Sequence, residues 1–233
     1  MKRIVLLLLL SLNSSASINF EDFIDLKDAL YRAFDELKPN SEHTLTVNNT
    51  YNLPEDYWWS LDVVHASYSR QGNSHNIFLF GGFARLSEMS LDGLAITACH
   101  EIGHGIGKAP FKDSGSSTEG QADYFATKIC LPIVFKYLAQ TVEVSKSKFN
   151  LNFCRESENN HYCLRALTAL ESNIFFFKTL GDTVHFSTRS TEVARELNTS
   201  PTFYPSSQCR LDTSLNGVLK KPRPACWYPM VLN

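Results

Sequence analysis

Several features that would place this chain in a broad functional class are absent from its sequence. Its 22 Lys and Arg residues are balanced by 24 Asp and Glu residues, and the formal net charge of −2 provides no basic face for a nucleic acid. The one dense basic cluster, residues 220–223, is interpreted as a solvated turn. No two of the six cysteines have CxxC spacing, which argues against a thioredoxin-like site and a cysteine zinc ribbon. Internal repeats and low-complexity segments are also missing, and the composition is that of an ordinary globular protein.

A hydrophobic run long enough to cross a bilayer is missing as well. The apolar stretch 4–10 is too short for this, and it follows Lys2 and Arg3 and precedes the small residues 14–16. This order is typical of a secretory signal peptide, which we predict at residues 1–16, with no cysteine for a lipid anchor. Residues 17–233 are then expected to form a single exported domain, periplasmic or secreted, without an integral membrane segment.

The cysteines agree with an oxidising compartment. Six cysteines permit three disulfides with fifteen connectivities, among which the sequence cannot choose. Cys154–Cys163 and Cys209–Cys226 would close short loops, which would leave Cys99 and Cys130 on two neighbouring helices. A buried free thiol at Cys99 is an equally good interpretation. Cys99 is a poor metal ligand, because on a helix it projects about a hundred degrees away from His100.

The most informative motif is HEIGH at residues 100–104, an HExxH sequence within a helix predicted over residues 91–105. His100 and His104 are four residues apart, so both rings project from the same helix face and can bind one ion. Glu101 then lies beside this ion, in a position to take a proton from water. The helix is apolar on most sides, and buried imidazoles are stabilised when they bind a cation. The alternative is an exposed polar stripe that merely faces water.

Catalytic zinc normally has three protein ligands, and a second helical pattern over residues 116–131 offers a third. Glu119 and Asp123 are four residues apart on this helix, and the segment 105–117 has the composition of a loop that joins two neighbouring helices. We expect Glu119 to complete a His-His-Glu zinc site and Asp123 to fix the ring of a ligand histidine. The alternative is helix capping, because the SSTE and TEGQ sequences both match the capping box.

The HEIGH and EGQAD sequences together resemble the HExxH…ExxxD arrangement of the gluzincin peptidases, and most closely the HtpX/BepA-type zinc metallopeptidases. The likeness covers residues 76–215, and part of the second helix also resembles ImmA/IrrE-type peptidases. The further stretches that match the HtpX/BepA pattern are residues 76–83, 91–94, 122–126 and 204–210. The chain departs from the pattern at Tyr204, where the family has a histidine, and it lacks the hydrophobic spans that anchor some members in membranes.

The resemblance implies a zincin-like fold and a role for the downstream motif. In such a fold, an edge strand just before the HExxH helix holds an extended substrate by main-chain hydrogen bonds. Tyr204 and Arg210 occupy the family-like downstream motif. They are therefore the leading candidates for the donor that stabilises the oxyanion, ahead of His161 and His185.

The hydrophobic patterns predict an α+β fold, with a small antiparallel sheet packed beside a helical core that carries the HExxH helix. The helices are expected at residues 20–37, 91–105, 116–131, 161–180, 191–198 and 206–218. The strands are expected at residues 43–47, 58–69 and 77–83, the last two forming a hairpin around a turn at 71–74.

These observations predict an exported zinc-dependent metallopeptidase that acts on polypeptides. His100, His104 and Glu119 would hold one Zn²⁺ ion, and Glu101 would take a proton from a zinc-activated water and pass it to the leaving amine. A second possibility is a non-catalytic zinc-binding protein of the same fold that serves as an envelope chaperone or binding module, although the intact Glu101 argues against it. A third is a metal-free structural domain, which the spacing of Glu119 and Asp123 argues against.

Overall fold

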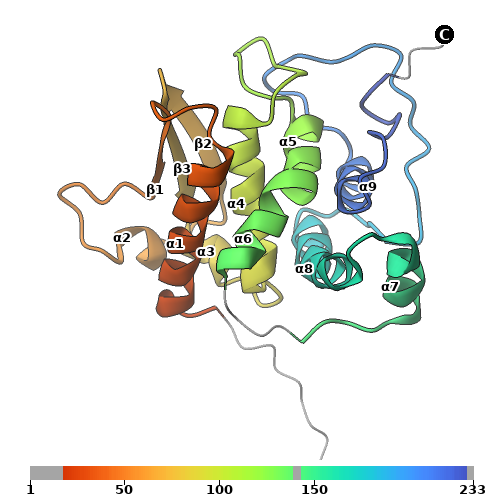
Figure 1. The fold of residues 1–233 in the computed structure, drawn as a ribbon, viewed down its shortest axis with the longest axis horizontal. Coiled ribbons are helices and arrows are strands. Elements are labelled where there is room, and N and C mark those ends of the chain that lie inside the picture. The colour runs from red at the N-terminus through yellow and green to blue at the C-terminus, as the bar shows by residue number, and fades with distance from the viewer. Residues whose placement is uncertain (1–17, 139–142, 230–233) are drawn as a thin grey trace, which may run out of the picture.

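The fold combines a small sheet with a helical core, as the α+β prediction requires (Figure 1). The computed structural model describes residues 18–138 and 143–229, so the signal peptide predicted at residues 1–16 lies outside the described residues. The elements are α1 (Phe20–Leu37), β1 (Thr44–Val47), α2 (Tyr57–Ser60), β2 (Ala66–Gln71), β3 (Ser74–Leu79), α3 (Gly81–Ala84), α4 (Leu91–Ile106), α5 (Glu119–Phe125), the π-helical turn η1 (Ala126–Cys130), α6 (Leu131–Tyr137), α7 (Lys148–Phe153), the 3-10 turn η2 (Cys154–Glu156), α8 (Asn160–Thr179) and α9 (Ser207–Val218).

The first helix, α1, has the bounds that its sequence pattern predicts. Asn19 and Asp22 form a capping box, in which each side chain accepts a hydrogen bond from the other residue's backbone N–H at 2.9 and 3.0 Å. The apolar stripe that contains Leu26, Leu30 and Phe34 is buried against α4 and α6.

The sheet is mixed, which corrects the predicted antiparallel arrangement. Its strand order is β1–β3–β2, and β3 pairs antiparallel with β2 but parallel with β1. The predicted hairpin between β2 and β3 is present and turns at Gly72, whose φ of +60° is accessible to glycine without strain. β1 is parallel because the chain from β1 to β3 first passes through the 48–65 connection and β2. Side-chain periodicity within β1 carries no information about that path.

Both hairpin strands are shorter than predicted. Residues 57–60 form the helical turn α2, and the chain leaves the sheet after Leu79 to enter α3. Gly82 N–H donates to the carbonyl of Leu61 (2.8 Å), and the Arg85 guanidinium donates to the carbonyl of Trp59, so these two turns bind each other instead of extending the sheet. Since β3 is the central strand, the edge strand beside the HExxH helix is β2, and the expectation that the strand just before this helix lies at the edge is wrong.

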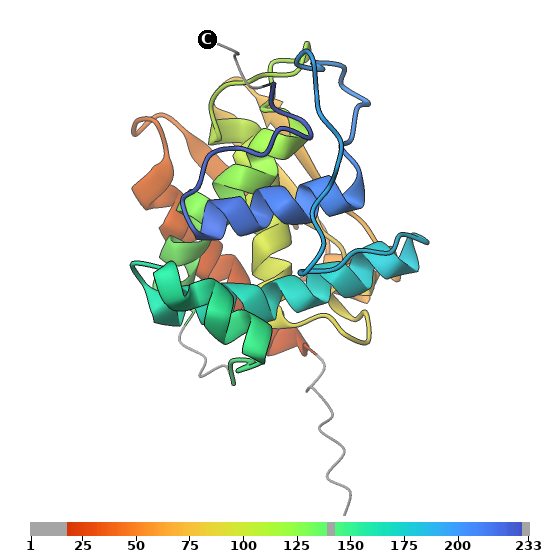
Figure 2. The same cartoon turned by 90° about the vertical axis from the view of Figure 1, so that its right-hand side faces the viewer.

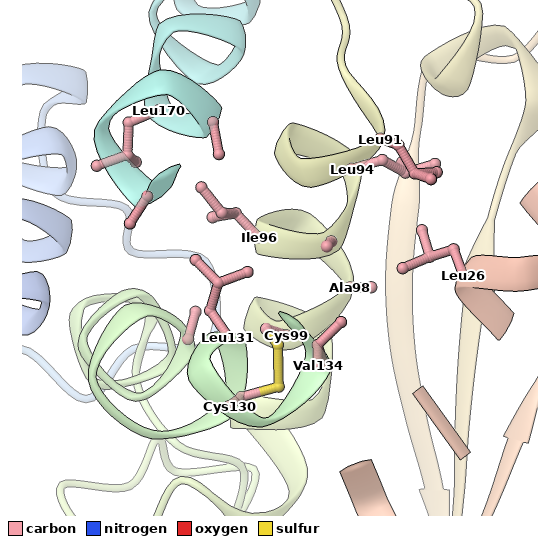
Figure 3. Close-up of a cluster of buried hydrophobic side chains, with 14 of the residues drawn as sticks. Leu26, Leu91, Leu94, Ile96, Ala98, Cys99, Cys130, Leu131, Val134 and Leu170 are labelled. Carbon is pink, nitrogen blue, oxygen red and sulfur yellow. A yellow bond between two sulfur atoms is a disulfide. The ribbon is translucent and has the colours of Figure 1, made fainter. Parts of the chain in front are cut away.

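Helix α4 passes through the middle of the core (Figure 3). Leu94 and Ala98 lie on the side of Leu26 from α1, whereas Ile96 lies toward Leu170 from α8. Nearly every residue of α4 is buried, as its uninterrupted apolar pattern predicts. The polar residues on this helix must therefore find partners inside the protein.

The predicted helix that contains Glu119 and Asp123 is continuous in direction but includes a π-helical turn. It begins at Glu119 instead of residue 116, because Thr118 has an extended backbone (ψ 161°), and it continues through η1 into α6. Gly103 permits its close approach to α4, since a Cβ at this position would lie 3.0 Å from the Cα of Ala122.

Three disulfides join these elements. Cys99–Cys130 connects α4 to η1 (Figure 3), Cys154–Cys163 connects η2 to α8, and Cys209–Cys226 connects α9 to the C-terminal segment. Both short loops expected from the sequence are therefore closed. All six cysteines are bridged, so Cys99 is a disulfide partner and not a free buried thiol.

Helices α8 and α9 lie across α4 and α5 on the side away from the sheet (Figure 2). The strap that connects them, defined as residues 181–206, contains no helix, so the helix predicted at residues 191–198 is wrong. Side chains of α9 bind its backbone instead: Gln208 accepts from His185 N–H (3.0 Å) and Asp212 accepts from Ser190 N–H (2.7 Å). Within the two described ranges, no helix combines the length and apolar character needed to span a bilayer.

Candidate metal centre

The predicted ligands converge from two helices. His100 and His104 lie one turn apart on α4, and Glu119 is the first residue of α5. The loop between the helices (residues 107–118) folds back onto α4, where Ser117 N–H donates to the carbonyl of His104 at 2.9 Å. This return places the start of α5 beside the two histidines, as the short loop length predicts.

The three side chains form a compact donor set. Glu119 Oε2 lies 3.2 Å from His100 Nε2, and Glu119 Oε1 lies 3.5 Å from His104 Nε2. One ligand atom from each residue can be chosen so that all lie within 4.8 Å of one another, a spacing that a single metal ion can bridge. Two imidazoles and one carboxylate form a common zinc ligand set.

The bonding of Glu119 also fits a cation better than a helix cap. Its side chain is 1% exposed, and Oε2 makes no hydrogen bond of acceptable geometry in the described part of the chain, although His100 Nε2 lies 3.2 Å away. A buried carboxylate oxygen without a donor is costly, and a bound cation would remove this cost. The capping alternative receives no support from Thr118, the N-cap residue, because its hydroxyl makes no capping hydrogen bond.

Both histidine rings are held through Nδ1, which leaves Nε2 for an ion. His104 Nδ1 is 2.9 Å from the carbonyl oxygen of Ser117. His100 Nδ1 is 2.7 Å from Asp123 Oδ1, a close contact whose direction departs from that of an ideal hydrogen bond. Oxygen acceptors at Nδ1 favour the tautomer with its lone pair on Nε2, which is the arrangement typical of metal-binding histidines.

Asp123 is anchored in turn by Arg210 from α9. Arg210 Nε and Nη2 donate to the two carboxylate oxygens of Asp123 at 2.8 and 2.9 Å. Burial opposes ionisation of Asp123, but Arg210 and His100 together hold its pKa below the usual value. Arg210 is thus bound to Asp123 in the manner of a structural ion pair, and its Nη2 is 3.9 Å from Glu119 Oε2. The expected role of Arg210 as an oxyanion donor remains a prediction.

Burial and mutual charges shift the pKa values of the metal-free cluster in opposite directions. Burial alone would lower the pKa of His100, but the charges of Asp123 and Glu119 raise it to about 10. Burial disfavours the charged form of Glu119, whereas the adjacent His100, His104 and Arg210 hold its pKa well below the usual range. Burial lowers the pKa of His104 to about 4, helped by the neighbouring His100 charge. The raised pKa favours the protonated form of His100 in the metal-free protein. A metal ion that binds Nε2 must therefore displace a proton from this nitrogen.

Glu101 lies with the ligands around a cavity of about 430 Å³. Burial raises its pKa to about 7, and the nearby positive charges of His100, Arg210 and Lys112 limit this rise. A carboxylate with a pKa near neutrality can both accept and donate a proton under mild conditions. The cavity walls come from the start of β2, from α4 and α8, from the 107–118 loop and from the strap.

The structure brings some of the other predicted residues to this cavity and leaves others away from it. Tyr204 lines the cavity but is 59% exposed, and His161 and His185 are not among the lining residues. Lys112 also faces the cavity and lies 2.6 Å from Glu119 through Nζ, although nothing in the sequence pattern singles it out. A lysine in an irregular loop has no periodicity or motif spacing that could reveal such a contact.

Comparison with known proteins adds no assignment, since no protein-family model, curated protein or solved structure matches this chain. The site is therefore defined by its own chemistry: a buried His-His-Glu cluster that could bind a metal ion, with the carboxyl group of a fourth residue, Glu101, beside it.

Proposed function

We propose that this protein is a metal-dependent hydrolase. The observation that carries the proposal is the convergence of His100, His104 and Glu119 on one point, next to Glu101 at the wall of a cavity. This combination of a cation site and a nearby proton acceptor is what hydrolysis by an activated water requires.

Within this class, we propose a zinc metallopeptidase of the gluzincin type, similar to the HtpX/BepA family. The zincin-like fold is supported by the position of the small sheet beside α4 and by the HExxH…ExxxD spacing, which places His100 and His104 on one helix and Glu119 and Asp123 on the next. The contact of Asp123 with His100 agrees with the role expected from the resemblance.

A peptide substrate is favoured by the outer edge of β2. The carbonyl of His65 accepts from Phe80 N–H at 3.3 Å, so this pair is hydrogen-bonded, and the antiparallel register alternates from there. The backbone N–H and C=O groups of Ala66 and Tyr68 are therefore directed away from β3, and both residues line the cavity. In the described ranges no strand pairs with this edge. An extended peptide could add there as a further strand, with its side chains alternating into the cavity.

The chemistry follows from the groups around the cavity. When bound, zinc supplies a Lewis acid that lowers the pKa of water and polarises a carbonyl oxygen. The Glu101 carboxylate accepts the proton of the attacking water and passes it to the leaving amine. Asp123 and Ser117 hold the histidine rings in place, and the edge of β2 orients the peptide. Tyr204, on the strap, is the proposed donor to the carbonyl oxygen as it gains negative charge.

Export is part of the same proposal. The three disulfides fit a non-cytoplasmic compartment. The signal peptide at residues 1–16 is the proposed route, and the protein would act in a periplasm or outside the cell.

The proposal is tested by comparing the zinc-loaded protein with its Glu101→Gln variant on denatured casein, with cleavage followed by mass spectrometry. We expect the variant to retain one zinc ion and to lose turnover by about 10³-fold or more, because the ligands stay while the base is removed. Glu88→Gln, an exposed position outside the cavity, is the matched control and should cleave normally. Near-normal cleavage by Glu101→Gln would refute the mechanism, whereas zinc binding without cleavage by the natural protein would favour the binding-module alternative.

A further inference from the structure

Lys112 is a charged residue with a largely buried side chain that the mechanism above does not use. It lies in the 107–118 loop, and its side chain is only 10% exposed. Its backbone is fixed at both ends of a turn, because its N–H donates to the carbonyl of Ser116 (2.7 Å) and its carbonyl accepts from Gly115 N–H (2.9 Å). The loop therefore fixes the backbone of Lys112, and the contact with Glu119 holds its ammonium group at the cavity wall.

The two oxygens of Glu119 have different surroundings. Oε1 accepts a hydrogen bond from Lys112 Nζ at 2.6 Å. Oε2 has no hydrogen-bond partner in the described residues and lies 3.2 Å from His100 Nε2. One oxygen is thus occupied by a fixed ammonium group, and the other is left for an ion shared with the histidines.

The contact between Lys112 and Glu119 places an additional positive charge beside the proposed metal site. Arg210 also lies near Glu119, with Nη2 3.9 Å from Oε2, but it is paired with both oxygens of Asp123. Lys112 has no second carboxylate among its described contacts, which are Glu119, the carbonyl of Pro201 at 3.4 Å and the ring of Tyr204. A divalent cation that binds Glu119 must therefore share this carboxylate with the ammonium group and sit near its positive charge.

We propose that Lys112 is a positioning residue that tunes the metal site: it restrains Glu119 to bind the ion through Oε2 alone, and it lowers the affinity of the site for divalent cations. This inference rests on the proposed metal site but not on peptidase activity. The positive charge that Lys112 retains in the cavity would also favour negative charge developing on a bound substrate.

A purely structural role for Lys112 makes a different prediction. Lys112 contacts Pro201, and the adjacent Asp113 N–H donates to the carbonyl of Thr199 at 2.9 Å, so the loop is tied to the strap here. If Lys112 served only this connection, its loss would lower the stability of the protein and leave its metal affinity unchanged.

The test measures the zinc dissociation constant by competition with a chromophoric chelator, starting from zinc-loaded full-length protein. Lys112→Met should bind zinc at least about tenfold more tightly, since it removes the competing charge and the hydrogen-bond donor of Glu119 Oε1 in the metal-free state. Lys112→Arg, which keeps the charge, should stay within about threefold of the natural protein. Lys136→Met removes one charge from a surface pair with Glu36 and serves as the matched control, with no change expected.

The visible spectrum of the cobalt-substituted protein is a second measurement, and a change in stability alone would not alter it. The visible spectrum of the Co²⁺ form should change in Lys112→Met, because both oxygens of Glu119 become free to bind, and should be restored in Lys112→Arg. An unchanged or larger zinc dissociation constant in Lys112→Met, or in Lys112→Gln if the methionine variant does not fold, would overturn the inference while leaving the proposed function intact. Failure of the natural protein to bind zinc at all would overturn both.

Discussion

Removal of the Cys99–Cys130 disulfide is expected to weaken both the fold and the metal site. Cys99 directly precedes His100, and Cys130 ends the η1 turn that continues the helix of Glu119 and Asp123, so this bond joins the two ligand-bearing segments (Figure 3). Other helix contacts and the 107–118 loop orient the ligands as well, but this bond is the one disulfide between these two helices within the described residues.

The magnitude follows from the lengths of the closed loops. The sequence separation is 31 for Cys99–Cys130 and 9 for Cys154–Cys163. In the chain-entropy account, these loops contribute about 4 and about 3 kcal/mol to the free energy of unfolding at 25 °C. All four cysteines are fully buried, so replacement by alanine leaves comparable small cavities in both cases. The difference between the two double variants, about 1 kcal/mol, therefore reports the loop length.

Urea unfolding of the metal-free proteins and zinc titration of the folded proteins would measure the two effects. Cys99→Ala/Cys130→Ala should lose more stability than Cys154→Ala/Cys163→Ala and should bind zinc more weakly. The Cys154–Cys163 pair lies away from the ligands, so its double variant should keep the natural zinc affinity. Equal zinc affinity in the two double variants would refute the argument that the Cys99–Cys130 bond orders the site, and a reversed order of stabilities would refute the loop-length argument.

Three further predictions concern buried ionisable residues. Asp92→Ala should lower the free energy of unfolding by about 3–5 kcal/mol in urea titrations, because Asp92 accepts two hydrogen bonds from buried Arg165, and a loss below about 1 kcal/mol would contradict this. Glu119→Ala should reduce zinc retention in dialysis far more than Asp123→Ala, and the opposite ranking would mean that their roles are exchanged. Burial, with the charges of nearby groups, lowers the pKa of His75 to about 4. The unfolded chain therefore binds more protons between pH 6.5 and 4, and stability should fall as the pH falls through this window, less so in His75→Gln.

The parts of the fold that depend on local sequence patterns could be predicted from the sequence. The bounds of α1 follow from its apolar stripe and capping box, and the burial of α4 follows from its uninterrupted apolar run. The HExxH spacing predicts two rings on one helix face, because helical geometry alone fixes their direction. The third ligand, Glu119, could be proposed because the short loop brings the next helix back to the same face.

The remaining features depend on contacts between distant segments. The parallel pairing of β1 with β3 is set by the path of the 48–65 connection, which the side-chain periodicity of β1 does not encode. The strap has residues compatible with a helix at 191–198, but its backbone binds distant segments instead. Ala194 N–H donates to the carbonyl of Ala225 at 2.8 Å, and the preceding residues His185 and Ser190 are bound by side chains of α9. Lys112 reaches Glu119 only because its loop folds inward, which sequence spacing does not encode.

The central claim is that His100, His104 and Glu119 bind a single cation. X-ray absorption at the zinc edge of the zinc-loaded protein measures this most directly, because imidazole ligands give a distinctive multiple-scattering signal. We predict one zinc ion per chain with two imidazole nitrogens at about 2.0–2.1 Å and oxygen as the remaining ligand type. A protein that takes up no zinc, or a spectrum with one imidazole or none, would contradict the claim.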